Sequence, residues 1–195
     1  MLTVGITGGI GSGKSVVCQV FGTLGIPAFS ADAAARYLME NDAALICSIS
    51  GLLGPDVYKS GKLDRAQVAA IIYGQPEKLQ RLNAIVHPAT TAYSRKWIIE
   101  QRAPYVIKEA AIFFESGTYI DMDVMIGVYA PKELRITRAM KRSAMDRDQV
   151  LAIIARQMDE DEKMQRCDFV ITNDDTTAVL PQVLNMHEQL LNRKR

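Results

Sequence analysis

Residues 8–15 read Gly8-Gly9-Ile10-Gly11-Ser12-Gly13-Lys14-Ser15. This run matches the phosphate-loop pattern G-x-x-x-x-G-K-[ST], whose glycines let backbone N–H groups curl around phosphate oxygens without obstruction by side chains. A merely flexible glycine turn is the alternative for such a stretch. Because every fixed position of the pattern is matched, we predict contacts to nucleotide phosphates from Gly9, Ile10, Gly11, Ser12, Gly13, Lys14 and Ser15.

The flanks of this loop predict a strand before it and a helix after it. Residues 2–7 form a short β-branched run that stops at the glycines, and a helical period begins at about Lys14. The apolar positions of that helix are Val17, Val20, Phe21 and Leu24. The helix would point its positive N-terminal end at the phosphates, Lys14 would reach the β and γ groups, and the Ser15 hydroxyl would bind Mg²⁺.

Further short apolar runs predict a parallel sheet. They are residues 26–29, 124–129, 169–172 and 105–107, the last extending toward residue 114. Gly25 suits the end of the first helix, so the chain begins with a βαβ unit. A final helix is predicted near residues 178–191.

Residues 32–102 read as helical, and no strong strand is predicted among them. The expected breaks are Gly51, Gly54, Gly61 and Gly74, and the expected helix starts are Asp64, Pro76 and Pro88. This region would be an insertion into the α/β core.

Composition limits the classes of function. The 195 residues are 48% hydrophobic, enough for one domain with its own core, and the formal net charge is +1. Such a balance gives no electrostatic footprint for nucleic acid or an anionic membrane. No apolar run approaches a membrane span, and the three cysteines lack zinc or disulfide spacing, so we expect a soluble, cytoplasmic protein.

A GTPase or motor ATPase would use the same phosphate loop. The chain carries no N-K-x-D guanine signature and no evident switch machinery, and it is short. These observations favour a compact ATP-dependent kinase of a metabolite.

The acceptor side of such a reaction requires a base. Asp32 follows the second predicted strand, at the sheet edge where parallel strands present ligands, and its carboxylate could accept a proton from an acceptor hydroxyl. The alternative is a helix N-cap, and Asp32 could serve in both roles.

Three other ionisable side chains are candidates for a functional role. Glu109 and Glu115 flank an apolar stretch, so either could hold Mg²⁺ through water or contact the acceptor, and the alternative for each is a solvated loop carboxylate. His87, before Pro88, is a weaker candidate because a lone histidine is more often structural.

An arginine-rich helix follows the 124–129 run. Arg135, Arg138 and Arg142 recur at three- and four-residue spacing, which places them on one helix face that could clamp a triphosphate. Phosphoryl transfer requires that water be kept from the γ-phosphate, so this segment is the natural lid. The alternative is a solvated charged face, because the acidic run of residues 159–162 lies nearby.

The longer run from Thr7 to Ser15 resembles the dephospho-CoA kinase family, which favours the wording T-G-G-I-G-S-G-K-[ST]. Other motifs of that family follow in order along nearly the whole chain. They are Ala31-Asp32 with Ala35-Arg36, Leu82-Asn83 through His87-Pro88, Phe114-Glu115, Arg138 with Arg142, Gln157, and Asp168 through Asn173.

The resemblance implies a P-loop α/β fold of the nucleoside-monophosphate-kinase type, with five parallel strands flanked by helices. Residues 1–30, 103–135 and 161–195 would form the nucleotide-binding core, residues 31–102 a helical acceptor domain for CoA, and residues 136–160 a helical lid. The implied reaction converts ATP and dephospho-CoA to ADP and CoA, and a monomer is expected.

The resemblance also implies roles for single residues. Asp32 would be the base for the ribose 3′-hydroxyl, while Lys14 and Arg138 would stabilise the transferring phosphoryl group. Arg142 would join the phosphate contacts, and Ser15 would hold Mg²⁺. The remaining implied contacts are His87 and Glu115 on the acceptor side and Asn173, after the last strand, on the adenine side.

The chain departs from the family pattern in two places. It has Ser30-Ala31-Asp32 where the family commonly has D-A-D, and Ala111-Ile112-Phe113 where the family has P-L-L. The second change removes a rigid proline before Glu115. Two rivals stay open: a kinase of the same architecture acting on a nucleoside monophosphate or shikimate, and a regulatory protein that holds ATP without an acceptor.

Overall fold

The computed structural model describes residues 1–143 and 145–193. The chain forms two compact units, one of Met1–Ser30 with Gln101–Arg195 and one of Ala31–Glu100. Each unit buries its own cluster of apolar side chains. The second unit is therefore inserted into the chain of the first.

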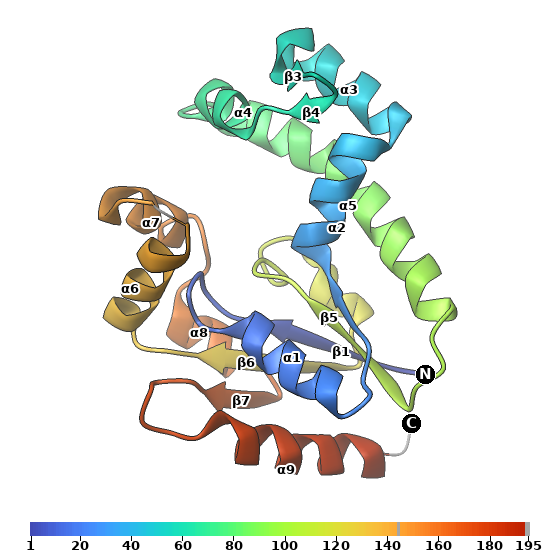
Figure 1. Cartoon of the computed structure of the whole chain (residues 1–195), viewed down its shortest axis with the longest axis vertical. Helices are drawn as coiled ribbons and strands as arrows, with labels where there is room; N and C mark the ends of the chain where they lie inside the picture. Colours follow the sequence, from blue (N-terminus) through green and yellow to red (C-terminus); the bar gives the residue numbers. More distant parts are fainter. Residues whose placement is uncertain (144, 194–195) are drawn as a thin grey trace. The chain divides into compact units, whose positions relative to one another are not determined.

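The first unit is built on a five-stranded parallel sheet with the order β2-β5-β1-β6-β7 (Figure 1). The strands are β1 (Leu2–Thr7), β2 (Ala28–Ser30), β5 (Tyr105–Glu109), β6 (Val124–Tyr129) and β7 (Phe169–Thr172). All five residues of β5 are buried, as expected for a parallel strand covered on both faces. The predicted five-stranded parallel sheet is confirmed.

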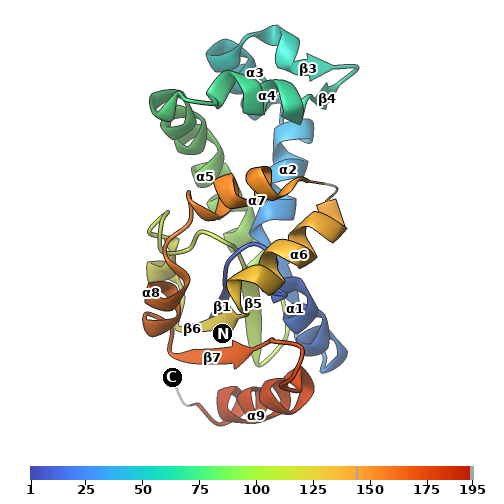
Figure 2. The ribbon, with the colours of Figure 1, turned by 90° about the vertical axis from the view of Figure 1, so that its left-hand side faces the viewer.

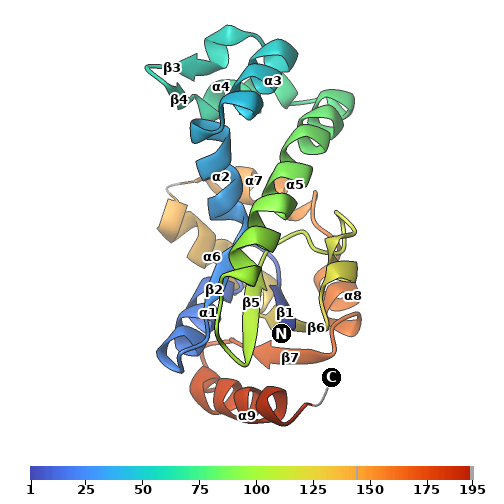
Figure 3. The same ribbon diagram turned by 90° about the vertical axis from the view of Figure 1, so that its right-hand side faces the viewer.

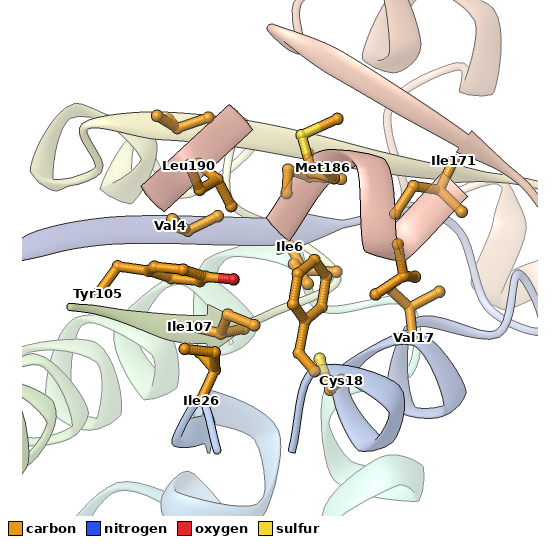
Figure 4. Packing of buried hydrophobic residues seen from close by; sticks show 14 of the residues in the cluster. Val4, Ile6, Val17, Cys18, Ile26, Tyr105, Ile107, Ile171, Met186 and Leu190 are labelled. Atoms are coloured by element: carbon orange, nitrogen blue, oxygen red, sulfur yellow. The ribbon is translucent and has the colours of Figure 1, made fainter. Parts of the chain in front are cut away.

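Helices cover both faces of this sheet, and Figure 2 shows α9 along β7. The helices of the first unit are α1 (Lys14–Thr23), α6 (Lys132–Ser143), α7 (Arg147–Ile154), α8 (Glu160–Gln165) and α9 (Val179–Asn192), with the short η2 (Thr118–Asp121). Between α1, α9 and the sheet, Val17, Ile107 and Met186 are buried together (Figure 4). The phosphate loop thus begins at the end of β1, the central strand of the sheet, whose Val4 and Ile6 are buried in this core.

The second unit is helical, with α2 (Ala31–Asn41) and α3 (Ala43–Leu53) packed on the long α5 (Pro76–Ile99) (Figure 3). The short η1 (Pro55–Val57) and α4 (Arg65–Ile72) complete it, with Asp64 as the N-cap of α4. Among the described residues, no helix is both long and apolar enough to cross a membrane.

Three expectations for the second unit are wrong. Pro88 does not start a helix but lies inside α5, because buried Val86 and Thr90 hold the helix to the core on both sides of it. Gly51 lies inside α3, where a glycine costs only about 1 kcal/mol. Strands also occur, since β3 (Tyr58–Lys59) pairs with β4 (Lys62–Leu63) across Ser60-Gly61, whose positive φ angles suit a two-residue turn.

Candidate active site

The phosphate loop joins β1 to α1 in a conformation that requires glycine. Gly11 and Gly13 have φ angles of 78° and 95°, in the left-handed region. A Cβ atom on Gly11 would lie 2.2 Å from the backbone oxygen of Arg135, and one on Gly13 would lie 2.0 Å from Nδ2 of Asn173. Glycine is therefore required here both by the backbone angles and by the close approach of Arg135 and Asn173 to the loop.

Positive groups gather at the end of this loop. Gly13 is the N-cap of α1 and offers no side chain to cap the first turn, so the helix presents its N–H groups and the positive end of its dipole. The buried Lys14 folds back over the loop, and its Nζ donates to the carbonyl oxygens of Gly8 at 2.9 Å and Gly9 at 3.1 Å. The arrangement suits an anion.

Oxygen groups that suit a hard cation lie beside the phosphate loop. The Ser15 hydroxyl is 3.4 Å from Oε1 of Glu109, the last residue of β5, which is buried. Among residues 1–143 and 145–193 no cluster of three His, Cys, Asp or Glu side chains could hold a metal alone. A hydroxyl and one carboxylate fit Mg²⁺, which keeps several waters and takes further oxygens from phosphates.

Arg138 and Asn173 are brought together. Arg138 lies on α6, and its guanidinium donates to the backbone oxygen of Asn173 at 3.0 Å and to its Oδ1 at 3.3 Å. Asn173 in turn donates from Nδ2 to the backbone oxygen of Ser12 at 2.8 Å. An ion pair with the exposed Asp175, which the sequence analysis did not name, completes the contacts of Arg138. The loop after β7 thus links α6 to the phosphate loop.

The three arginines predicted on one face of α6 differ in burial. Arg135 is buried and donates from Nε to the Ala130 carbonyl, whereas Arg142 is exposed in the last turn. Spacing alone places side chains on a helix face, but it does not say which of them the neighbouring elements cover.

Glu115 lies against α8 rather than beside Ser15. Its Oε1 accepts from the buried Lys163 Nζ at 2.9 Å and from the Met158 N–H at 2.7 Å, and Lys163 also donates to the Ala111 carbonyl. Burial acts to raise the pKa of Glu115, but the hydrogen bonds from Met158 and Lys163 outweigh it and hold that pKa below its ordinary value.

Replacing Glu115 with glutamine is expected to cost about 3 kcal/mol of unfolding free energy at neutral pH, because Lys163 is left buried without a counter-charge. A carboxylate whose folded pKa is depressed stabilises the fold above its unfolded pKa, and that contribution is lost as the pH falls through the folded pKa. Urea unfolding between neutral pH and about pH 3 checks this. The difference between wild type and Glu115→Gln should shrink on acidification, whereas a constant difference would contradict the ion pair.

Asp32 and His87 belong to the second unit. Asp32 is exposed in the first turn of α2, where Ala31 is the first residue, so Asp32 lies one position inside the helix and is not its N-cap. The chain enters α2 directly from Ser30 of β2, whose partner in the sheet is Glu109. His87 is half-buried on α5, and burial lowers its pKa, which favours the neutral imidazole.

Two side chains that the sequence analysis did not single out for a role contact the phosphate loop. Glu160 accepts from the Gly9 N–H, and Gln157 accepts from the Ile10 N–H. Glu160 belongs to the acidic run of residues 159–162, which entered the sequence analysis only as support for a solvated arginine face. Four consecutive acidic residues give no local signal for the one that is buried, so only its contacts identify it.

Comparison with known proteins agrees with these features. The family model described as dephospho-CoA kinase matches residues 2–178. A dephospho-CoA kinase of Bacteroides fragilis is 34% identical over 186 residues, which cover 95% of this chain and 91% of that protein.

Two solved structures are similar to this chain over nearly its whole length. A Thermus thermophilus protein has a TM-score of 0.84 and 34% identity, covering 98% of this chain and 96% of its own. Dephospho-CoA kinase from Campylobacter jejuni has a TM-score of 0.70 and 26% identity, with 97% of each chain covered. The match spans both units, and the chain belongs to the dephospho-CoA kinase family.

Proposed function

We propose that this chain transfers the γ-phosphoryl group of ATP to the ribose 3′-hydroxyl of dephospho-CoA, which yields ADP and CoA in the final step of CoA biosynthesis. The observation that carries the proposal is the phosphate loop with Lys14 folded over it and the uncapped N-terminus of α1, in a chain that shares its whole length with this family. Residues 31–102 would bind the acceptor and residues 136–160 would form the lid.

The triphosphate would be bound by the loop from Gly9 to Ser15. Phosphoryl transfer is catalysed mainly by positioning and by neutralising charge on the phosphate oxygens. Lys14 would supply positive charge from a buried position, where electrostatic interactions are stronger than in water, and the first-turn N–H groups of α1 would add the positive end of the helix dipole.

Ser15, with Glu109 acting through water, would hold Mg²⁺. Their 3.4 Å separation supports Glu109 over Glu115, which is engaged by Lys163. Bound Mg²⁺ would neutralise charge on the β- and γ-phosphate oxygens.

Arg138 and Arg142 would close over the phosphates from α6. Support for Arg138 comes from its contacts with Asn173, whose amide reaches the backbone of Ser12 in the phosphate loop. Asn173 would lie on the adenine side. Closure of an arginine-bearing lid would exclude water and deliver positive charge to the transferring group.

Asp32 would take the proton of the 3′-hydroxyl. It is exposed at the first turn of α2, immediately after a strand at the edge where parallel sheets bind ligands. His87 and Glu115 would line the acceptor side. A cytoplasmic location and a monomeric state stay predictions from the sequence.

The test of the proposal is a panel of acceptors. The purified protein with Mg²⁺ and ATP would be offered dephospho-CoA, AMP or shikimate in parallel, and both ADP and the acceptor mass would be followed. The expected result is a gain of one phosphate by dephospho-CoA alone. Transfer to AMP or shikimate would keep the kinase and overturn the acceptor, while ATP binding without any transfer would favour a regulatory protein.

A further inference from the structure

The first half of the phosphate loop is held by a segment that lies about 150 residues away in the chain. Both carboxylate oxygens of Glu160 accept from the Gly9 N–H, at 3.2 and 3.1 Å, and Oε1 of Gln157 accepts from the Ile10 N–H at 3.1 Å. Glu160 begins α8, and Gln157 precedes it (Figure 1). Two consecutive N–H groups of the loop therefore have protein acceptors.

The Glu160 contact is a buried one. Arg135 and Glu160 are 5% and 9% exposed, with Nη1 and Oε2 3.3 Å apart, and Arg135 is itself anchored to the Ala130 carbonyl. A Cβ atom on Gly9 would lie 2.0 Å from Nη1 of Arg135 and 2.7 Å from Oε2 of Glu160, so a larger residue at this loop position would displace the pair. The Arg135–Glu160 ion pair is therefore buried and hydrogen-bonded to Gly9, unlike an ion pair between exposed side chains.

Ile10 is fixed by its side chain as well. It packs on the cluster of Ile136, Ala139 and Val150, which joins α6 to α7. Gly9 and Ile10 are thus held in two ways, by hydrogen bonds that their N–H groups donate to Glu160 and Gln157 and by apolar packing of Ile10 on α6 and α7.

Such anchoring has a consequence for ligand binding. A glycine-rich loop has more conformational freedom than other segments, and ordering it on binding reduces affinity. Acceptors that fix the N–H groups of Gly9 and Ile10 remove part of that cost in advance. With the Gly9 and Ile10 N–H groups used for anchoring, the phosphates would be bound by the N–H groups of residues 11–15 and of the first turn of α1, and Gly9 and Ile10 would contribute to the loop by holding its shape.

We propose that Glu160 and Gln157, with Arg135 as the counter-ion, are positioning residues that hold the phosphate loop in its ATP-binding form. The inference rests on the proposed function only in assigning ATP to the loop. Two other roles of these residues would give different results. A purely structural role would change only the amount of folded protein, whereas in a competing role Glu160 would occupy N–H groups that the phosphates need.

The test compares Glu160→Gln and Gln157→Met with a matched control, Glu162→Gln. Glu162 lies on the same helix with its side chain 59% exposed, so its variant removes the same charge from a surface position. Calorimetry would give the Kd of ATP, steady-state assays would give kcat and both KM values, and melting would report folding.

For Glu160→Gln, the Kd and KM of ATP are expected to rise about tenfold, because a charged acceptor at Gly9 is lost. For Gln157→Met the expected rise is about fivefold. The KM for dephospho-CoA should stay unchanged, and Glu162→Gln should match the wild type in every readout.

Other outcomes overturn the inference. A lower melting temperature with unchanged Kd for ATP would assign these residues to folding alone, and a lower Kd would show that Glu160 competes with phosphate. If Glu160→Gln fails to fold, Gln157→Met decides, because Gln157 is uncharged and half-buried. The ATP Kd needs no acceptor, so failure of the wild type to phosphorylate dephospho-CoA would overturn the proposed function and leave this test intact.

Discussion

Replacing Lys14 with methionine is expected to lower kcat by about 10³-fold. Lys14 is 8% exposed, and its ammonium group lies on the Gly8 and Gly9 carbonyls at the start of the phosphate loop. Methionine keeps the apolar stem and removes the ammonium charge that would stabilise the γ-phosphoryl group as it transfers. A buried charge acts at low dielectric, so water does not compensate for its loss.

Steady-state assays with saturating ATP and dephospho-CoA would measure this effect, with melting as the check on folding. Lys132→Met is the matched control, because Lys132 is exposed at the start of α6. Transfer within tenfold of the wild type would show that the loop backbone, and not Lys14, supplies the essential charge.

Replacing Asp32 with asparagine is expected to lower phosphoryl transfer by about 10²- to 10⁴-fold, the usual contribution of a general base. The amide keeps the size and hydrogen-bonding capacity of the carboxylate but cannot accept the proton. The Kd of ATP should stay unchanged, because the proposed phosphate contacts all lie in residues 9–15, on Arg138 and on Arg142. The effect should therefore appear in kcat and not in the binding of ATP.

Asp56→Asn is the control for this variant, since Asp56 is an exposed aspartate of the same helical unit. If the Asp32→Asn variant still transfers the phosphoryl group, Asp32 is not the general base, and another group must accept the proton. A weakened Kd of ATP would indicate instead that the substitution disturbs the nucleotide side.

Much of the core could be predicted because its signals are local. The bounds of β1, β6 and β7 match the apolar runs at residues 2–7, 124–129 and 169–172. A parallel strand buried on both faces is apolar along its length, so a window of a few residues is enough to find it. The phosphate loop is also contiguous, and the left-handed Gly25 ends the α1 segment as expected.

The ends of strands and helices could not be predicted from the sequence where packing against other elements sets them. The apolar run that begins at Tyr105 ends as a strand at Glu109, because β1, its neighbour in the sheet, is paired only as far as Ile6. Pro88 stays within α5 because packing against α2 and α3 outweighs the preference of proline for a helix start.

The sequence by itself determined the phosphate loop, the strands and the family resemblance, since these depend on residues adjacent in the chain. Only the tertiary structure decided which acidic residue of the 159–162 run meets Gly9, that Lys163 neutralises Glu115, and that Glu109 lies beside Ser15. These contacts join residues 48 to 151 positions apart. Such pairs form where the sheet order and the packing of helices bring elements together, and no local periodicity encodes that choice.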